Sequence, residues 1–161
     1  MMISKMTEPY AKDIFNWKYK APYDLYNSTE SEENLKELLD GSYYAVFNSE
    51  KSLIGFFCFG PNAQVPVGRT LGLYKDSSYL DIGLGMLPDL TGRGLGLPFL
   101  LRGLAFAEKE FQAEKFRLTV ATFNQRAISL YKKCFFKEGP TFPTDKYDFM
   151  IMFNEHFFKK N

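Results

Sequence analysis

The sequence predicts a mixed α/β protein in which a central sheet is covered by helices. Two runs of aromatic and branched residues, 43–47 and 53–59, are separated by a polar turn, which predicts an antiparallel hairpin. Further along the chain, an extended run at 79–87 is followed by a helical pattern at 97–111 and a second extended run at 116–121. A strand–helix–strand crossover of this kind implies at least one parallel pair of strands.

Length and composition favour one compact domain. The chain has 161 residues, of which 45% are hydrophobic and 24% are charged, and it contains 17 Phe and 10 Tyr. This apolar content can fill one sizeable core, so we expect a single domain over residues 1–161. The net charge of +1 gives no electrostatic sign of a nucleic-acid or membrane-surface partner.

The usual metal ligands and disulfide partners are scarce. The two cysteines, Cys58 and Cys134, are too few for a four-ligand zinc site or a disulfide scaffold. The one histidine, His156, follows the last predicted strand near a Lys-Lys pair, which favours a surface position. No signal-peptide pattern and no run of about 18 apolar residues is present, so we expect a cytoplasmic protein without a membrane span.

The N-terminal part predicts a strand and two helices before the hairpin. A short strand at 3–6 precedes a helix at 7–19, for which Thr7 is the expected N-cap. A second helix is predicted at 31–39 because its leucines recur at spacings of three and four, and Gly41 ends it.

Turn residues and periodicity predict the remaining elements. Residues 60–78 contain two prolines and three glycines and predict a loop. A short helix is predicted at 124–133, and closing strands are predicted at 134–136 and 147–153.

A glycine-rich turn at 87–96 carries the first chemical signal. It joins a strand to a helix, so backbone N–H groups at the helix N-terminus would face a bound anion. Gly92, Gly94 and Gly96 would let a phosphate approach without meeting a Cβ atom. The spacing differs from both the dinucleotide-binding fingerprint and the P-loop. The alternative is a glycine-rich connection that binds nothing.

The second signal lies in the helix predicted at 124–133. Asn124 follows a strand and can cap this helix. Ala127, Leu130 and Tyr131 share one face of the helix, which can point back toward the sheet. The phenol of Tyr131 can serve as a proton donor; the alternative is a core aromatic with a hydrogen-bonded hydroxyl.

Together, the two segments resemble the GNAT superfamily of acyl-CoA N-acyltransferases over residues 79–136. The family's pyrophosphate signature is Arg/Gln-x-x-Gly-x-Gly/Ala, and its later signature is Asn-x-x-Ala-x-x-Leu-Tyr-x-Lys-x-Gly-Phe. The first signature falls on Thr91, Gly92, Arg93, Gly94, Leu95 and Gly96, and the second is matched by Asn124, Ala127, Leu130, Tyr131, Lys133 and Phe136. The resemblance implies a mixed, mostly antiparallel central sheet with a parallel splayed pair, flanked by helices.

Three residues depart from the family pattern. Thr91 stands where the family has Arg or Gln, so it offers one hydroxyl in place of the customary charged or amide contact with the pyrophosphate. Phe135 stands where the family has Gly, which affects the turn into the next strand. Pro98 falls early in a helix and fits only if the helix starts close to it.

The resemblance implies acetyl-CoA as the co-substrate and no metal. The pantetheine arm would hydrogen-bond near Met86 and Leu87, where a backbone N–H would polarise the thioester carbonyl. The pyrophosphate would lie on residues 91–96, and Asn124 is also expected to bind the cofactor. An amine acceptor would attack the thioester directly, and Tyr131 would protonate the departing thiolate.

The base and the acceptor site are less clearly marked. Asp81, on the strand before the glycine turn, is the first candidate base, and a plain surface carboxylate is the alternative. Asp89 lies nearer the turn, where capping or solvent exposure would also explain it. Four aromatic residues are expected either to wall the acceptor site, as the early helices do in the family, or to pack in the core: Trp17, Tyr19, Tyr23 and Tyr26.

Three functions are consistent with these residues. The first is an N-acetyltransferase that moves the acetyl group of acetyl-CoA to a primary amine of a small molecule or a protein N-terminus, acting as a monomer or a homodimer. The second is a non-catalytic acyl-CoA-binding sensor or regulatory protein, and the third is a nucleotide-binding protein. Tyr131 favours the first, and the segment at 124–131 counts against the third.

Overall fold

The computed structural model describes residues 1–155 of the chain. His156 and its expected surface position lie outside the described residues. Within them the strands form a seven-stranded sheet of order β1-β2-β3-β4-β5-β7-β6. β4 (Leu80–Met86) and β5 (Phe116–Ala121) pair in parallel, whereas β1–β2, β2–β3, β5–β7 and β6–β7 are antiparallel. The mixed, mostly antiparallel sheet with one parallel pair is confirmed.

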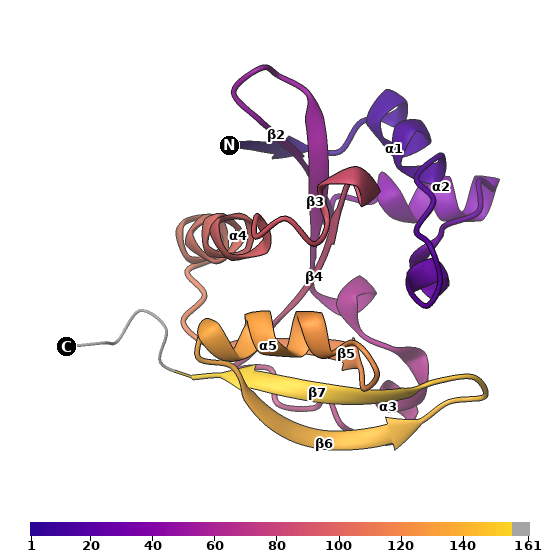
Figure 1. Ribbon diagram of the computed structural model, residues 1–161. Helices are drawn as coiled ribbons and strands as arrows, with labels where there is room; N and C mark the ends of the chain where they lie inside the picture. Colours follow the sequence, from indigo (N-terminus) through magenta and orange to yellow (C-terminus); the bar gives the residue numbers. More distant parts are fainter. Residues whose placement is uncertain (156–161) are drawn as a thin grey trace. The chain divides into compact units, whose positions relative to one another are not determined.

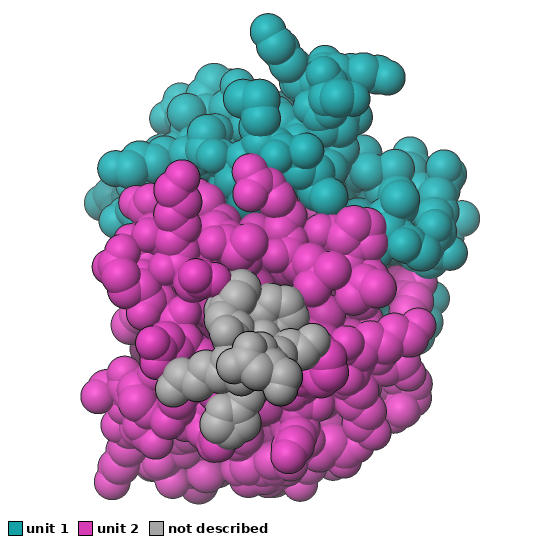
Figure 2. Space-filling view, turned by 90° about the vertical axis from the view of Figure 1, so that its left-hand side faces the viewer, with its two compact units in different colours: residues 1–58, 84–96 teal, residues 59–83, 97–161 magenta. Residues whose placement is uncertain are grey.

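The residues group into two compact units, which Figure 2 shows in two colours. The first unit contains Met1–Cys58 and Leu84–Gly96, and the second contains Phe59–Gly83 and the chain from Leu97 on. The single domain over residues 1–161 stays a prediction.

The first unit carries the N-terminal hairpin and two short helices that lie side by side (Figure 1). Ser31 caps the second helix, because its Oγ accepts a hydrogen bond from the N–H of Asn34 at 3.0 Å. Its elements are β1 (Met2–Lys5), α1 (Glu8–Phe15), the 3-10 helix η1 (Tyr23–Tyr26), α2 (Glu32–Leu38), β2 (Tyr43–Phe47) and β3 (Leu53–Phe59), whose last residue belongs to the second unit.

The first helix is shorter than its sequence pattern indicated. It begins after Thr7, as expected, but ends at Phe15. The N–H groups of Asn16 and Trp17 bond to carbonyls three residues back, which tightens the last turn and stops the helix. Trp17 and Tyr19 therefore lie beyond the helix, so the prediction that it runs to residue 19 is wrong.

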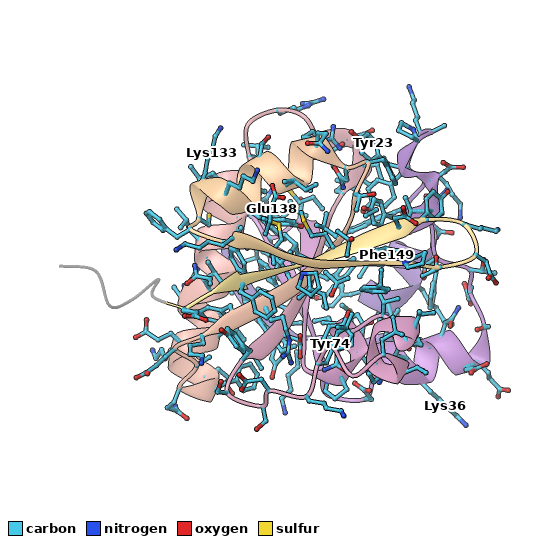
Figure 3. All side chains as sticks on the ribbon, turned by 90° about the horizontal axis from the view of Figure 1, so that it is seen from below. Tyr23, Lys36, Tyr74, Lys133, Glu138 and Phe149 are labelled. Carbon is cyan, nitrogen blue, oxygen red and sulfur yellow. The ribbon has the colours of Figure 1, made fainter. Side chains whose placement is uncertain are left out.

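The second unit contains the parallel pair and the C-terminal hairpin, along which α5 runs in Figure 1. Its core includes a cluster of Tyr74, Phe142 and Ile151, against which Phe149 packs. Tyr74 and Phe149 are labelled in Figure 3. Its further elements are η2 (Pro61–Ala63), α3 (Pro66–Thr70), α5 (Gln125–Lys133), β6 (Lys137–Pro143) and β7 (Asp148–Asn154).

Two segments of the second unit differ from their predictions. The region at 60–78, predicted as a loop, contains η2 and α3. Gly68 is a packing residue within α3, because an added Cβ atom there would lie 2.8 Å from Tyr74 and 3.0 Å from Phe142. Residues 134–136 form a turn after α5, and the strand predicted there begins only at Lys137.

The long helix α4 (Gly96–Phe111) connects the parallel strands along the chain. It begins two residues before Pro98, so the proline lies in the first turn, where its missing N–H costs no helical hydrogen bond. The helix therefore starts close to Pro98, as the sequence required for a proline at this position.

Candidate functional site

The glycine turn lies between the end of β4 and the start of α4. After β4 the chain forms a short 3-10 helix, η3 (Pro88–Leu90), and the hydroxyl of Thr91 donates a hydrogen bond to the carbonyl of Pro88 at 2.7 Å. Gly92 and Gly94 both have φ of +74°, a backbone conformation that side chains disfavour. A Cβ atom added to Gly94 would meet nothing within 4 Å. The turn is thus exposed and leads directly into the N-terminus of a 16-residue helix.

The last residues of β4 are held by contacts within the first unit. Gly85 lies so close to the ring of Phe56 that an added Cβ atom would be 2.4 Å from it. The carbonyl of Met86 accepts a hydrogen bond of 2.6 Å from the hydroxyl of Tyr19, and burial raises the pKa of Tyr19 to about 12. The N–H of Leu87 donates to the carbonyl of Ile54 at 2.9 Å. The N–H of Leu87 therefore already has a partner, and the backbone N–H expected near Met86 and Leu87 to polarise the thioester stays a prediction.

A cavity of about 120 Å³ lies within the first unit, beside Tyr19. Of the four aromatic residues that the sequence placed at an acceptor site or in the core, Trp17, Tyr19 and Tyr26 line this cavity and Tyr23 does not. Sequence reasoning missed Glu37, because a glutamate on an exposed helix carries no local signal. The lining residues are Ile14, Phe15, Trp17, Tyr19, Tyr26, Ser28, Asn34, Glu37, Leu38, Tyr43 and Phe56.

Asp81 belongs to a buried ion pair in the second unit. It lies opposite Arg117 in the parallel register of β4 and β5, and the side chains of Arg117 and Asp81 are only 2% and 6% exposed. Arg117 donates from Nε to Oδ1 at 2.7 Å and from Nη2 to Oδ2 at 2.8 Å, and Gln64 donates to Oδ2 at 2.9 Å. This surrounding excludes the surface-carboxylate alternative and does not favour the predicted role of base.

The guanidinium of Arg117 is held on all sides. It donates to the carbonyls of Asp76 and Tyr74 at 3.0 and 3.3 Å, and it lies over the rings of Tyr74 and Tyr79. Burial alone would lower the pKa of Arg117, but the hydrogen bonds and the charge of Asp81 outweigh burial and raise it. Arg117 therefore stays charged, and its contact with Asp81 joins the two parallel strands where their pairing begins.

The parallel pairing is short. Its register covers Leu80 with Phe116 and Asp81 with Arg117, although both strands continue beyond these residues. The last paired residue of β4 is Asp81, and the next residue, Ile82, also belongs to the second unit.

Asn124 occupies the start of α5, as the sequence indicated. Its Oδ1 accepts a hydrogen bond from the N–H of Ala127 at 3.1 Å, so its predicted role as N-cap is confirmed. The side chain is buried, with 8% exposed. Its expected contact with the cofactor stays a prediction. The other candidate carboxylate, Asp89, is exposed in η3.

Tyr131 lies in the last turn of α5 and is buried, with 9% exposed. Its ring packs against Phe136 with centroids 6.1 Å apart, and its carbonyl accepts a hydrogen bond from the N–H of Phe136 at 3.0 Å. Phe135 between them has φ of +69°, in the left-handed region. The family's glycine at this position now has a physical reason, since only glycine takes that conformation without strain.

The described residues show neither a metal centre nor a membrane-spanning helix. Within residues 1–155, no three His, Cys, Asp or Glu side chains gather into a group that could hold a metal ion. Among the same residues, no helix has the length and apolar content that a bilayer crossing requires.

Comparison with protein families identifies the class. The model of the acetyltransferase (GNAT) family matches residues 11–136, which is most of the chain. The protein therefore belongs to the GNAT family of acetyltransferases. Comparison with curated proteins gave no match.

Solved structures share the fold at low sequence identity. A chimera of the spermidine N-acetyltransferase SpeG from Vibrio cholerae and hSSAT is similar with a TM-score of 0.69 at 19% identity, over 94% of this chain and 93% of that one. A GNAT acetyltransferase from Bacillus anthracis gives 0.70 at 14% identity, over 95% and 93%. A putative phosphinothricin N-acetyltransferase gives 0.70 at 15% identity, over 96% and 98%.

Proposed function

We propose that the protein is an acetyl-CoA-dependent N-acetyltransferase that acts on a primary amine. The observation that carries the proposal is the exposed turn with Gly92 and Gly94 at φ of +74°, which leads into the N-terminus of α4. The first N–H groups of a helix have no acceptor within the helix, and together with the helix dipole they form a site for the diphosphate of a CoA ester. Membership of the acetyltransferase family supports this choice of ligand.

The chemistry is a direct transfer. The amine nitrogen attacks the thioester carbonyl, a new C–N bond forms, and the C–S bond breaks as the thiolate departs. We propose that Tyr131 protonates the thiolate, as the match to the family's second signature implies. A CoA-type thiol has a reference pKa of about 8.5, so a phenol is acidic enough to assist its departure.

Asp81 takes a different role in this proposal from the one expected of it. A general base needs an oxygen that can receive a proton from the substrate, and both oxygens of Asp81 already accept hydrogen bonds from Arg117. Transfer of the amine's proton to such a carboxylate would neutralise it and break a buried ion pair, which is costly. We propose that Asp81 joins β4 to β5 and that the proton of the attacking amine passes to solvent water.

The cellular location is proposed on the state of the cysteines. Cys58 and Cys134 are both free and buried, and burial raises the pKa of the Cys58 thiol to about 12. Thiols kept in this form suit the reducing cytoplasm.

The experiment that tests the diphosphate site is calorimetric titration of acetyl-CoA into the Gly94→Val variant. The side chain would stand where the diphosphate must lie, so affinity should fall at least tenfold, or about 1.4 kcal/mol. The backbone strain of a residue at positive φ is a separate effect, which a second variant measures. Gly41 has φ of +100° and equally open surroundings, so Gly41→Val carries comparable strain.

The two variants separate binding from folding. Gly41→Val should bind acetyl-CoA as the unmodified protein does, while both variants lose a similar amount of stability. Unchanged affinity in folded Gly94→Val would remove the diphosphate from this turn. Equal losses of affinity in both variants would assign the effect to strain.

A further inference from the structure

The cavity of the first unit has walls that are chiefly aromatic. The ring of Phe56 lies 6.2 Å from that of Trp17 and 6.1 Å from that of Tyr43, and Tyr19 and Tyr26 meet edge to face at 6.3 Å, all between ring centroids. The faces of aromatic rings carry partial negative charge and attract cations. The walls therefore suit a group that is flat or apolar and also positively charged.

Two of the phenols at the cavity can act only as hydrogen-bond acceptors toward a ligand. Tyr19 donates its only hydroxyl proton to the carbonyl of Met86, and Tyr43 donates its own to Oε2 of Glu37, both at 2.6 Å. Each phenol has one proton, so these two oxygens can offer only lone pairs to a ligand. Asn34 donates from Nδ2 to the carbonyl of Thr29 at 2.7 Å, which uses one of its donors as well.

Charge gives the same indication. Among the residues that line this cavity, Glu37 carries the charge, and it is exposed. Tyr43 contacts one of its oxygens, and the second oxygen of a carboxylate can accept further bonds. A ligand with N–H donors and a positive charge would meet a carboxylate, phenol lone pairs and ring faces together.

The size of the cavity limits what can enter it. An engineered cavity of about 150 Å³ holds a benzene molecule, so a volume of about 120 Å³ suits a group no larger than one ring. A long polyamine would place most of its length and its other charges outside the cavity, whose lining residues include a single carboxylate, that of Glu37.

We propose that this cavity is the acceptor site, and that it selects a compact amine with a single positive charge and a small flat or apolar body. This inference rests on the proposed function, because it identifies the class of amine that is acetylated. The hydrogen bond from Tyr19 to Met86 supports the placement, since it joins a wall of the cavity to the strand end near which the thioester is expected. The cavity binds the ammonium form, which is the form of such amines in neutral water.

Calorimetric titration of the whole chain tests this class without any acetyl transfer. The probe is phenethylamine, with 2-phenylethanol and 3-phenylpropionate as neutral and anionic molecules of similar shape. Phenethylamine should bind at least tenfold more tightly than either, and spermidine should bind no more tightly than phenethylamine. Equal binding of the amine and the alcohol, or tighter binding of spermidine, would overturn the proposal.

Two variants and two matched controls locate the effect. Glu37→Gln keeps an oxygen for the hydroxyl of Tyr43 but removes the charge, so the affinity for phenethylamine should fall about fivefold. Tyr26→Leu removes one exposed ring and should cost about threefold. Glu33→Gln on the same helix and Tyr23→Leu on the same 3-10 helix alter residues that do not line the cavity, and they should leave the affinity unchanged.

The results distinguish this proposal from the proposed function. If Glu37→Gln and Glu33→Gln bind phenethylamine equally well, the cavity is not the amine site, even where acetyl-CoA binding and turnover of another amine are retained. If phenethylamine binds as predicted but acetyl-CoA does not bind, the cavity is upheld as an amine site and the acetyltransferase proposal fails.

Discussion

Two turns in this molecule contain residues at similar positive φ but adjoin opposite ends of a helix. The turn at 91–95 contains Gly92 and Gly94 at φ of +74°, and the turn at 134–136 contains Phe135 at φ of +69°. Each turn borders a helix, and each belongs to one of the two segments that resemble the family signatures. The first turn precedes α4, whereas the second follows α5.

The polar groups of the second turn are satisfied within the chain. The N–H of Phe135 bonds to the carbonyl of Lys132 at 3.1 Å, and the N–H of Phe136 bonds to that of Tyr131 at 3.0 Å. This is the Schellman arrangement, and the ring contact between Tyr131 and Phe136 is the apolar contact that accompanies it. The turn therefore closes the carbonyl end of α5 and leads the chain into β6.

The first turn adjoins the N-terminus of α4, whereas the second adjoins the C-terminus of α5. The N–H groups that begin α4 find no acceptors in the helix itself, because helical bonds run from each N–H to a carbonyl four residues earlier. A left-handed residue is thus not a mark of a binding site by itself. The distinguishing feature is which helix end the turn adjoins, because an N-terminus presents N–H groups that the helix itself does not bond, whereas a C-terminus presents carbonyls.

The largest effect that separates the two turns is expected from Tyr131→Phe. The second turn holds Tyr131 through the hydrogen bond from the N–H of Phe136 to its carbonyl and through the contact between the two rings. The variant keeps the ring of Tyr131 but removes its hydroxyl proton. If Tyr131 protonates the thiolate, kcat should fall by roughly 10²–10⁴, while the free energy of unfolding changes by about 1 kcal/mol or less. The measurements are turnover of an accepted amine and denaturant unfolding.

Tyr74→Phe is the matched control for that variant. Tyr74 is 8% exposed against 9% for Tyr131, and its oxygen bonds to Thr119 and to the N–H of Val65. Loss of the Tyr74 hydroxyl should lower the free energy of unfolding and leave kcat within a few-fold of the value for the unmodified protein. Full turnover in Tyr131→Phe would make the second turn purely structural and leave solvent as the proton source.

Local signals account for what the sequence predicted correctly. Asn124 caps its helix through a residue three positions away, the second helix follows the start expected at Ser31, and the crossover at 79–121 follows from periodicity. Such bonds depend on near neighbours, so a sequence pattern contains them. The glycine turn was found for the same reason, because Gly92 and Gly94 adopt a conformation set locally.

Contacts between distant residues account for what the sequence did not predict. Gly68 indicated a loop but instead permits close packing with Tyr74 and Phe142. Asp81 had the position of a base, but its partner Arg117 lies 36 residues away on another strand. The cavity that includes Glu37 likewise depends on how α1, η1, α2 and the strands β2 and β3 pack, which no single segment reveals.

An intermediate effect is expected from Phe135→Gly, which should raise the free energy of unfolding instead of lowering it. A side chain in the left-handed conformation costs about 1–2 kcal/mol, and glycine costs about 0.5–1 kcal/mol in chain entropy, so the variant should be more stable by about 0.5–1 kcal/mol. Urea unfolding measures the gain. Lys133→Gly, two residues earlier in the exposed last turn of α5, should instead lose about 1 kcal/mol. Destabilisation in both variants would mean that the Phe135 side chain contributes more than its backbone strain costs.

The smallest effect is expected from Thr91→Arg in the first turn. The Thr91 hydroxyl already donates to the carbonyl of Pro88, so it has little left to offer a phosphate, and a guanidinium would restore the charged contact that the family has at this position. Acetyl-CoA should bind about threefold more tightly in low salt, and the gain should shrink as salt screens the added charge. Thr91→Val loses the hydroxyl without adding charge, so it should leave affinity nearly unchanged in calorimetry. Looser binding by Thr91→Arg at both salt concentrations would show that residue 91 does not face the phosphates, and the contrast between the two turns would then rest on the glycines and the helix end alone.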